Sequence, residues 1–333
     1  MLGNYLRTLV VRSARWLVLL AALFAFGLVS CADDARQATA TATVEATSTA
    51  AATETAAATE VAPAPVEATD SSGTTLTLAA PAARIVSHSP ALTEILFAIG
   101  AGDRLVAVDE FSNYPAEVAD LPRVTYSSPD PEQDLAYEPD LVLFSGRQDG
   151  SLEHFRELGL PVFYLLEPTD LDGVFESIRT LGTLTGAEEG AEAVIADMEA
   201  RLAAVAAALE GVEDGPLVFY EITDDLYTVS PDSFIGAALA LLKVRNVAEG
   251  TEGAYPQLSS EAIVEANPDV ILMADADFVD PASVPQRAGW SGITAVVDGR
   301  IHPVDGDIMS RPGPRIVQGI EDLAKLLYPD RFP

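Results

Sequence analysis

Two acidic residues occupy equivalent places in two copies of one short sequence pattern. Glu132 begins the segment EQDLAYEPDLVLF, and Glu261 begins EAIVEANPDVILM. Each glutamate is followed by a helical pattern, a Pro-Asp pair and an apolar run of β type, with a constant offset (261 − 132 = 129). A carboxylate at such a position can stabilise the start of a helix. Two symmetric carboxylates can also pair with two basic groups of a partner protein. The spacing alone leaves both interpretations open.

Each of these glutamates is preceded by a tyrosine at the same distance. Tyr126 lies six residues before Glu132, and Tyr255 lies six residues before Glu261. A tyrosine offers a flat apolar face for stacking and a hydroxyl for a hydrogen bond at the edge of a ligand. A lone aromatic residue most often packs in the core, but the matched placement of these two favours a shared binding surface.

Nucleophilic and metal chemistry find little support in the sequence. It contains no G-x-S-x-G or H-E-x-x-H motif and no glycine-rich loop of the phosphate-binding type. Ser87 and His88 are neighbours on an expected strand, so their side chains point to opposite faces and cannot form a catalytic pair. His88 can ligate a metal, titrate or simply form a hydrogen bond there, and His154 and His302 show no spacing with it. We therefore expect no catalytic residue, no metal site, no intrinsic cofactor and no enzymatic activity.

The charge balance excludes nucleic acid as a partner. The 333 residues carry 19 Lys plus Arg against 51 Asp plus Glu, a formal net charge of −32. A surface of this sign repels phosphate backbones. Only Lys243 and Lys325 are lysines, so the chain has no polybasic membrane patch. The one cysteine, Cys31, excludes a disulfide framework.

The first 30 residues resemble a secretion signal. Three arginines precede the apolar run Trp16–Leu28, whose 13 residues are too few for a membrane span. The sequence Leu-Val-Ser before Cys31 resembles a bacterial lipobox, which predicts that Cys31 is the lipidated first residue of the mature protein. An uncleaved anchor, or a signal with an incidental cysteine, is the alternative. A lipid at this site places the protein outside the cytoplasm, on a membrane surface.

Residues 31–73 are predicted to be a disordered tether. Within them, Ala35–Ser72 contains 14 Ala and 9 Thr and no Leu, Ile, Phe, Tyr, Trp or Met. Such a segment has too little apolar surface to offset the entropy lost on ordering.

The remaining chain predicts an α/β fold with two Rossmann-like lobes. Apolar β-type runs alternate with helical patterns over residues 74–186, and this alternation restarts over residues 212–333. Between them, residues 187–211 contain one long helix rich in Ala, Glu and Leu. Two lobes joined by a single connecting helix leave a cleft, and such clefts are common ligand sites. A helical connector restricts opening of the cleft to a small rocking motion.

Several segments together resemble one family of transport proteins. The resemblance covers about residues 74–333, and it rests on RIVSHSPALTEIL from Arg84, GAGDRLVAV from Gly100, Asn113-Tyr114-Pro115, the two Glu…Pro-Asp segments, and DGDIMSRPGPR from Asp305. These segments are similar to those of ABC-transporter substrate-binding proteins with a helical connector, which capture iron–siderophores, haem or cobalamin. The chain resembles the vitamin B12-binding members most.

The resemblance implies partners. In this family an acidic residue on each lobe pairs with arginines of the membrane permease, and the matching residues are Glu132 and Glu261. The implied partners are an ABC importer permease dimer with its ATPase subunits, and the protein is expected to be a monomer.

The resemblance also implies a set of ligand contacts. The transported ligand is expected to be cobalamin, with a ferric siderophore or haem as alternatives. The expected contacts are Phe111 and Tyr126 in the first lobe, Tyr227 and Tyr255 in the second, and the polar pair Asp307 and Arg311. Ser87 and His88 are added because they end a strand at the expected mouth of the cleft. Arg147 stands near the place of a tryptophan in the B12-binding proteins, and its guanidinium suits a more anionic ligand.

Overall fold

The computed structural model describes residues 64–146 and 150–332, which belong to one compact unit. The predicted signal sequence, the lipidation site Cys31 and most of the predicted tether lie outside these residues.

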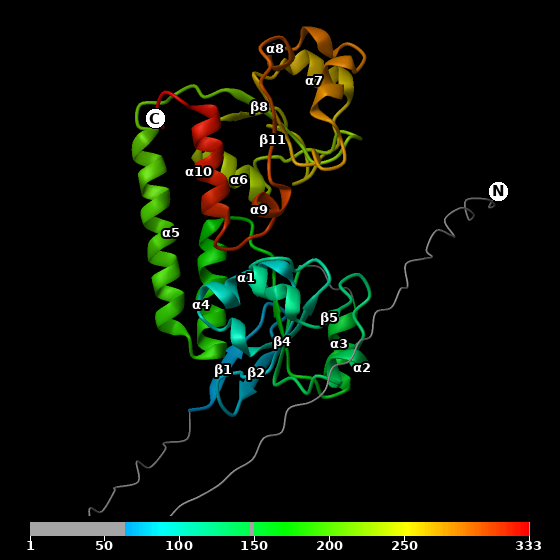
Figure 1. The fold of residues 1–333 in the computed structure, drawn as a ribbon, viewed down its shortest axis with the longest axis vertical. Helices are drawn as coiled ribbons and strands as arrows, with labels where there is room; N and C mark the ends of the chain where they lie inside the picture. Colours follow the sequence, from blue (N-terminus) through cyan, green and yellow to red (C-terminus); the bar gives the residue numbers. More distant parts are fainter. Residues whose placement is uncertain (1–63, 147–149, 333) are drawn as a thin grey trace, which may run out of the picture. The chain divides into compact units, whose positions relative to one another are not determined.

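The first lobe contains a five-stranded parallel sheet in the order β5-β4-β3-β6-β7 (Figure 1). Its strands are β3 (Ile85–His88), β4 (Leu105–Asp109), β5 (Arg123–Val124), β6 (Leu141–Ser145) and β7 (Val162–Leu165). Its helices are α1 (Pro90–Ala98), α2 (Pro131–Leu135), α3 (Ser151–Glu157) and α4 (Leu171–Thr185), with short 3₁₀ turns η1 (Gly102–Arg104) and η2 (Ala116–Asp120). The central strands β3 and β6 are buried at every position, as expected for a parallel sheet covered on both faces.

The second lobe repeats this plan with a four-stranded parallel sheet in the order β11-β10-β8-β9. Its strands are β8 (Leu217–Glu221), β9 (Arg245–Asn246), β10 (Val270–Met273) and β11 (Ile301–Pro303). Its helices are α6 (Phe234–Leu241), α7 (Ser260–Ala266), α8 (Thr294–Val297), α9 (Gly306–Ser310) and α10 (Ile316–Leu327), with 3₁₀ turns η3 (Pro281–Gln286) and η4 (Trp290–Gly292). The structure thus confirms the expected α/β fold with two lobes.

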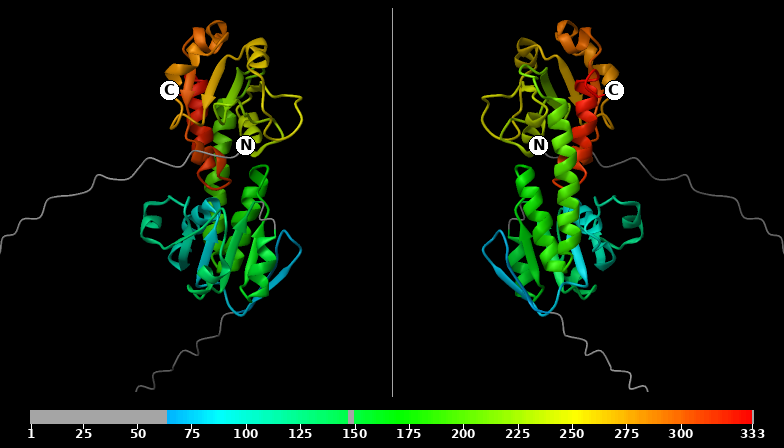
Figure 2. Two further views of the ribbon diagram at one scale, coloured as in Figure 1. Left: turned by 90° about the vertical axis from the view of Figure 1, so that its right-hand side faces the viewer. Right: turned by 90° about the vertical axis from the view of Figure 1, so that its left-hand side faces the viewer.

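A long helix, α5 (Glu188–Ala208), runs between the two lobes, where the sequence predicts a connecting helix (Figure 2). It packs against α4 of the first lobe and α10 of the second. Arg201 of α5 forms two hydrogen bonds to Glu321 of α10, at 2.9 and 2.7 Å. Because both lobes pack on the same helix, α5 is a shared support as well as a connection.

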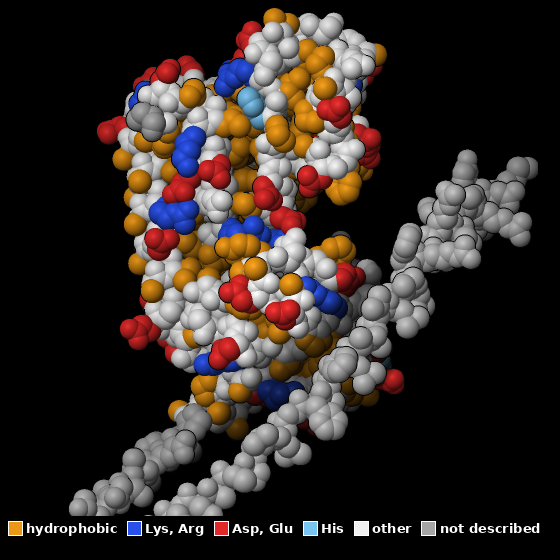
Figure 3. Space-filling view, in the orientation of Figure 1, with side chains coloured by type: hydrophobic (Ala, Val, Ile, Leu, Met, Phe, Trp, Pro, Cys, Tyr) orange, Lys and Arg blue, Asp and Glu red, His pale blue; other side chains and the backbone are white. Residues whose placement is uncertain are grey.

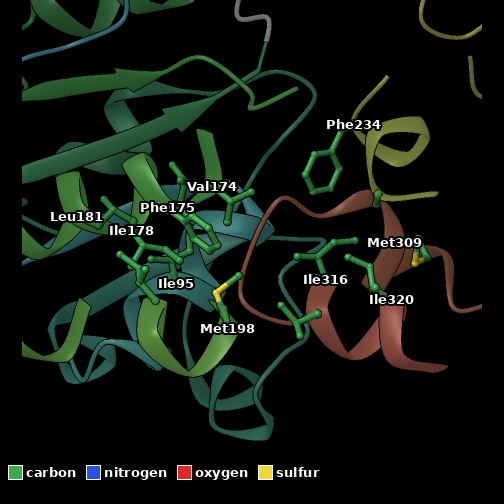
Figure 4. Packing of buried hydrophobic residues seen from close by; sticks show 14 of the residues in the cluster. Ile95, Val174, Phe175, Ile178, Leu181, Met198, Phe234, Met309, Ile316 and Ile320 are labelled. Carbon is green, nitrogen blue, oxygen red and sulfur yellow. The ribbon is translucent and has the colours of Figure 1, made fainter. Parts of the chain in front are cut away.

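One hydrophobic cluster extends through both lobes and α5. Figure 4 shows Ile95 of α1 and Ile178 of α4 near Met198 of α5, with Ile316 and Ile320 of α10 further along. All five side chains are at most 2% exposed. The two sheets therefore rest on a common core.

The prediction that residues 31–73 are disordered is wrong at the C-terminal end of this segment. A hairpin of β1 (Val66–Thr69) and β2 (Thr75–Leu78) forms within and just after the segment expected to be disordered. Asp70 in its turn is buried and accepts a hydrogen bond from Arg156 of α3 at 2.6 Å. This ion pair and the packing of Val66 on the main core order a sequence that has little apolar surface of its own.

The crossing of α5 over the end of α1 requires a glycine. A Cβ atom at Gly190 would lie 2.2 Å from the carbonyl oxygen of Ile99. We predict that Gly190→Ala lowers the free energy of unfolding by about 2 kcal/mol, because backbone must move to admit the methyl group. Gly292→Ala is the control, since no atom lies within 4 Å of its Cβ position. Urea unfolding of both variants checks this, and equal stability of the two would contradict it.

The second lobe buries a carboxylate beside an ion pair. Asp275 is 5% exposed, and neither carboxylate oxygen has a hydrogen-bond partner within the described part of the chain. Nearby, Arg287 donates two hydrogen bonds to Glu221, at 2.5 and 2.6 Å. Burial is the largest cause that raises the pKa of Asp275, and the negative charge of Glu221 raises it further, to about 6. The charge of Asp224 adds to this increase, and the positive charge of Arg287 opposes it.

This raised pKa predicts a pH dependence of stability. The folded protein holds the Asp275 proton more tightly than the unfolded chain, so stability falls as pH rises from about 4 to about 6 and stays reduced above that. Asp275→Asn removes this loss, and we expect it to raise stability at pH 7.5 by about 1–2 kcal/mol. Thermal unfolding from pH 4 to 8 is the measurement, with the exposed Asp298→Asn as control. A variant that follows the wild-type pH profile would refute the assignment.

Candidate functional site

Two adjoining cavities lie between the lobes. One has a volume of about 550 Å³ and the other of about 950 Å³. Glu167, Asp307 and Ser310 line both cavities, so they form one continuous cleft. Figure 3 shows this side of the molecule hollowed between the two lobes, with acidic and hydrophobic side chains at the edges. Volumes of this size suit a small organic ligand.

The smaller cavity contains the predicted aromatic residues of the first lobe. Phe111 and Tyr126 line it, and their rings make an edge-to-face contact with centroids 5.5 Å apart. Phe111 follows β4 and Tyr126 follows β5, at the carboxyl ends of neighbouring strands. The backbone N–H of Tyr126 donates to the Glu110 carboxylate at 2.5 Å. The carboxyl edge of the sheet thus places both rings in the cleft.

The larger cavity contains the predicted aromatic residues of the second lobe. Tyr227 and Tyr255 line it, 40% and 51% exposed. Their two segments are held side by side, because Tyr227 forms an isolated antiparallel bridge with Gln257 and Thr228 donates its N–H to the carbonyl of Pro256. Each lobe therefore contributes two of the predicted rings to the cleft.

The predicted polar pair lies at the base of the cleft and joins the lobes. Arg311 donates to Glu94 of α1 at 2.8 Å and to the Asn113 side-chain oxygen at 2.7 Å, and lies 2.7 Å from Asp307. Asn113 in turn donates to Asp307 at 2.9 Å. Arg315 adds two bonds to Glu94, at 2.7 and 2.5 Å.

Ser87 and His88 do not line the cleft, so their predicted ligand contacts are wrong. Both are 0% exposed at the end of β3. The Ser87 hydroxyl bonds within the first lobe, and the His88 Nε2 lies 2.8 Å from the Asp134 carboxylate. The His88 ring stacks on Phe144, with centroids 4.3 Å apart. The strand ends beneath the chain that forms the cleft wall, so these side chains are part of the core. Arg147 lies outside the described residues.

Glu132 and Glu261 have matching local geometry. Each is exposed and is the second residue of a short helix, α2 or α7. Asp130 caps the first helix through the N–H of Glu132, and Ser259 caps the second through the N–H of Ala262. The repeated sequence therefore folds into repeated structure, and contact with a permease stays a prediction.

Sequence reasoning missed several residues that line the cleft. Glu110, Glu167, Tyr220 and Phe278 all lie on its walls. Burial raises the pKa of Glu167. The pKa values of Tyr126 and Tyr255 are raised first by burial and then by the charge of Glu167, which lines both cavities. The sequence carried no signal for Phe278, because the 129-residue repeat relates it to Asp149, which is not aromatic.

The described part of the chain contains neither a metal-binding cluster nor a membrane-spanning helix. No group of three or more His, Cys, Asp or Glu side chains there is arranged to hold a metal ion. Among residues 64–146 and 150–332, no helix combines the length and the apolar character needed to cross a membrane.

Comparisons with known proteins agree with this architecture. The chain is 32% identical over 277 residues to YvrC of Bacillus subtilis, an uncharacterized ABC transporter substrate-binding lipoprotein, covering 80% of this chain and 87% of YvrC. It is 32% identical over 275 residues to a cobalamin-binding protein of Halobacterium salinarum, covering 79% and 74% of the two chains. The solved structure of the periplasmic haem-binding protein RhuT from Roseiflexus sp. RS-1 matches with a TM-score of 0.68 and 26% identity, over 74% of this chain and 98% of RhuT.

The sequence pattern of the periplasmic binding proteins matches residues 85–307, which include the parallel sheets of both lobes and most of the cleft. The resemblance inferred from the sequence is thereby confirmed. This chain belongs to the periplasmic binding protein family.

Proposed function

We propose that this protein is the substrate-binding component of an ABC importer and that its cleft captures cobalamin or a related corrinoid. Lipidation at Cys31 would hold it outside the cytoplasm, on a bacterial membrane. The similarity to a substrate-binding lipoprotein and to a cobalamin-binding protein supports both parts of this proposal. The family binds and delivers solutes, which favours a transport role over enzymatic activity.

The distribution of exposed aromatic rings carries the proposal. Six large aromatic side chains are exposed within the described residues, and five of them line the two cavities. They are Phe111, Tyr126, Tyr227, Tyr255 and Phe278. The exposed surface of these rings contributes nothing to the core, so their collection on facing walls of one cleft indicates a ligand with a broad, largely apolar face. A corrin ring has such a face.

Haem is the second candidate, and the similarity to RhuT favours it. A porphyrin presents the same flat face to aromatic walls, but it carries carboxylates. The described walls of the cleft include Glu110, Glu167, Asp277, Asp305 and Asp307, and the guanidinium of Arg311 is already bonded to Glu94. This acidic lining favours an uncharged periphery, such as the amides of a corrinoid, over carboxylates. A ferric siderophore is the remaining alternative.

Calorimetric titration of the purified protein with cyanocobalamin, haemin and several ferric siderophores tests this assignment. We expect sub-micromolar affinity for cyanocobalamin and weaker binding of the other ligands. Tighter binding of haemin or of a siderophore would overturn the corrinoid assignment and leave the transport role in place. Failure to bind any of these ligands would overturn the proposal for the cleft.

The paired tyrosines are predicted to contact the ligand from opposite lobes. Tyr126→Ala combined with Tyr255→Ala should weaken cyanocobalamin binding at least tenfold, because both stacking surfaces are lost. The double Tyr→Phe variant keeps the rings and should retain most of the affinity. Unchanged affinity of the double alanine variant would reject this role.

The symmetric glutamates are predicted to dock onto the permease. Glu132→Ala combined with Glu261→Ala should leave ligand affinity unchanged and abolish uptake in cells, because both charge pairs with the partner are lost. Glu117→Ala with Glu252→Ala is a control of equal charge, with one exposed residue from each lobe. Normal uptake by the first variant, or equal loss by the control, would contradict the docking role.

A further inference from the structure

Phe278 has the most exposed large hydrophobic side chain within the described residues. It lies in the loop between β10 and η3 and is 92% exposed. Leaving an aromatic ring this exposed gains the fold no burial of apolar surface. The position of the ring therefore requires an explanation other than packing.

The loop that carries this ring is braced on both sides. The backbone N–H groups of Phe278 and Val279 both donate to the carbonyl of Asp275, at 2.8 and 2.9 Å. Ala276 and Val279 pack against the hydrophobic cluster of the second lobe. Asp280 then caps η3 through the N–H of Ala282. The turn thus holds Phe278 out of the core while its neighbours are anchored in it.

The ring lies on the wall of the larger cavity. Tyr227 and Tyr255 line the same cavity, as does the hydroxyl-bearing ring of Tyr220. That hydroxyl is buried and has no hydrogen-bond partner in the described part of the chain. Burial raises the pKa of Tyr220, so its hydroxyl stays neutral. The second lobe therefore offers apolar rings together with one unused polar group.

We propose that Phe278 is a specificity-determining residue that contacts an apolar part of the transported ligand at the edge of the second lobe. This inference rests on the proposed function of the cleft. A phenyl ring has no hydrogen-bonding group, so its contact is a ring face or an alkyl edge of the ligand. Because the turn is already braced, little conformational entropy is lost when the ring is covered.

The test compares Phe278→Ala with wild type by calorimetric titration, using cyanocobalamin and haemin as probes, and by thermal unfolding without ligand. We expect at least a tenfold loss of affinity for the probe that wild type binds, with an unchanged unfolding temperature. Val297→Ala is the matched control, since this residue of the same lobe is 68% exposed and does not line either cavity. It should bind as wild type does.

A direct readout uses Phe278→Trp, whose fluorescence should be quenched when either coloured probe enters the cleft. Unchanged affinity of Phe278→Ala while wild type binds would overturn this inference alone and leave the proposed function standing. Loss of uptake with full affinity would also overturn it, because the ring would then contact a protein partner. Failure of wild type to bind either probe would overturn the inference together with the cleft assignment behind it.

Discussion

The carboxylate of Glu94 is the contact on which the geometry of the cleft depends. It is 3% exposed on α1 of the first lobe and accepts hydrogen bonds from Arg311 and Arg315, more than 200 residues later in the chain. Removing one member of a buried ion pair typically costs about 3–5 kcal/mol, because the other charge is left unpaired. Arg311 also contacts Asn113 and Asp307, so the same set of charges fixes the base of the cleft and the facing edges of both lobes. This junction therefore sets how the rings of the first lobe face those of the second.

The buried and the exposed aromatic residues of this chain lie in different parts of the fold. The core is built from aliphatic side chains and a few fully buried rings, such as Phe144, Phe219 and Trp290. The exposed rings are carried instead by loops at the carboxyl ends of the strands, where their loss leaves the sheets intact. The fold can therefore keep its stability while the loops adapt the cleft to a particular ligand.

The sequence predicted the lobes, the connecting helix and the paired tyrosines because all of them depend on local patterns or on the 129-residue repeat. It failed where the outcome depends on tertiary contacts. The sequence predicts that His88 ends a strand with its side chain open to the cleft. In the structure, Asp134 and Phe144 enclose that side chain. The strand β1 has the composition of a tether, and the ion pair between Asp70 and Arg156 orders its hairpin. Glu94 carries no local signal, since both arginines that bind it come from the far end of the chain.

The bonds between Glu94, Arg311 and Arg315 also bear on how a cargo could leave. Spreading the lobes at that edge would expose a desolvated carboxylate and strip two guanidinium groups of their acceptor, which thermal motion alone does rarely. In the proposed transport role, such a junction would disfavour spontaneous release of a bound ligand. Release of the ligand would then require a partner of the kind proposed above to separate the two lobes.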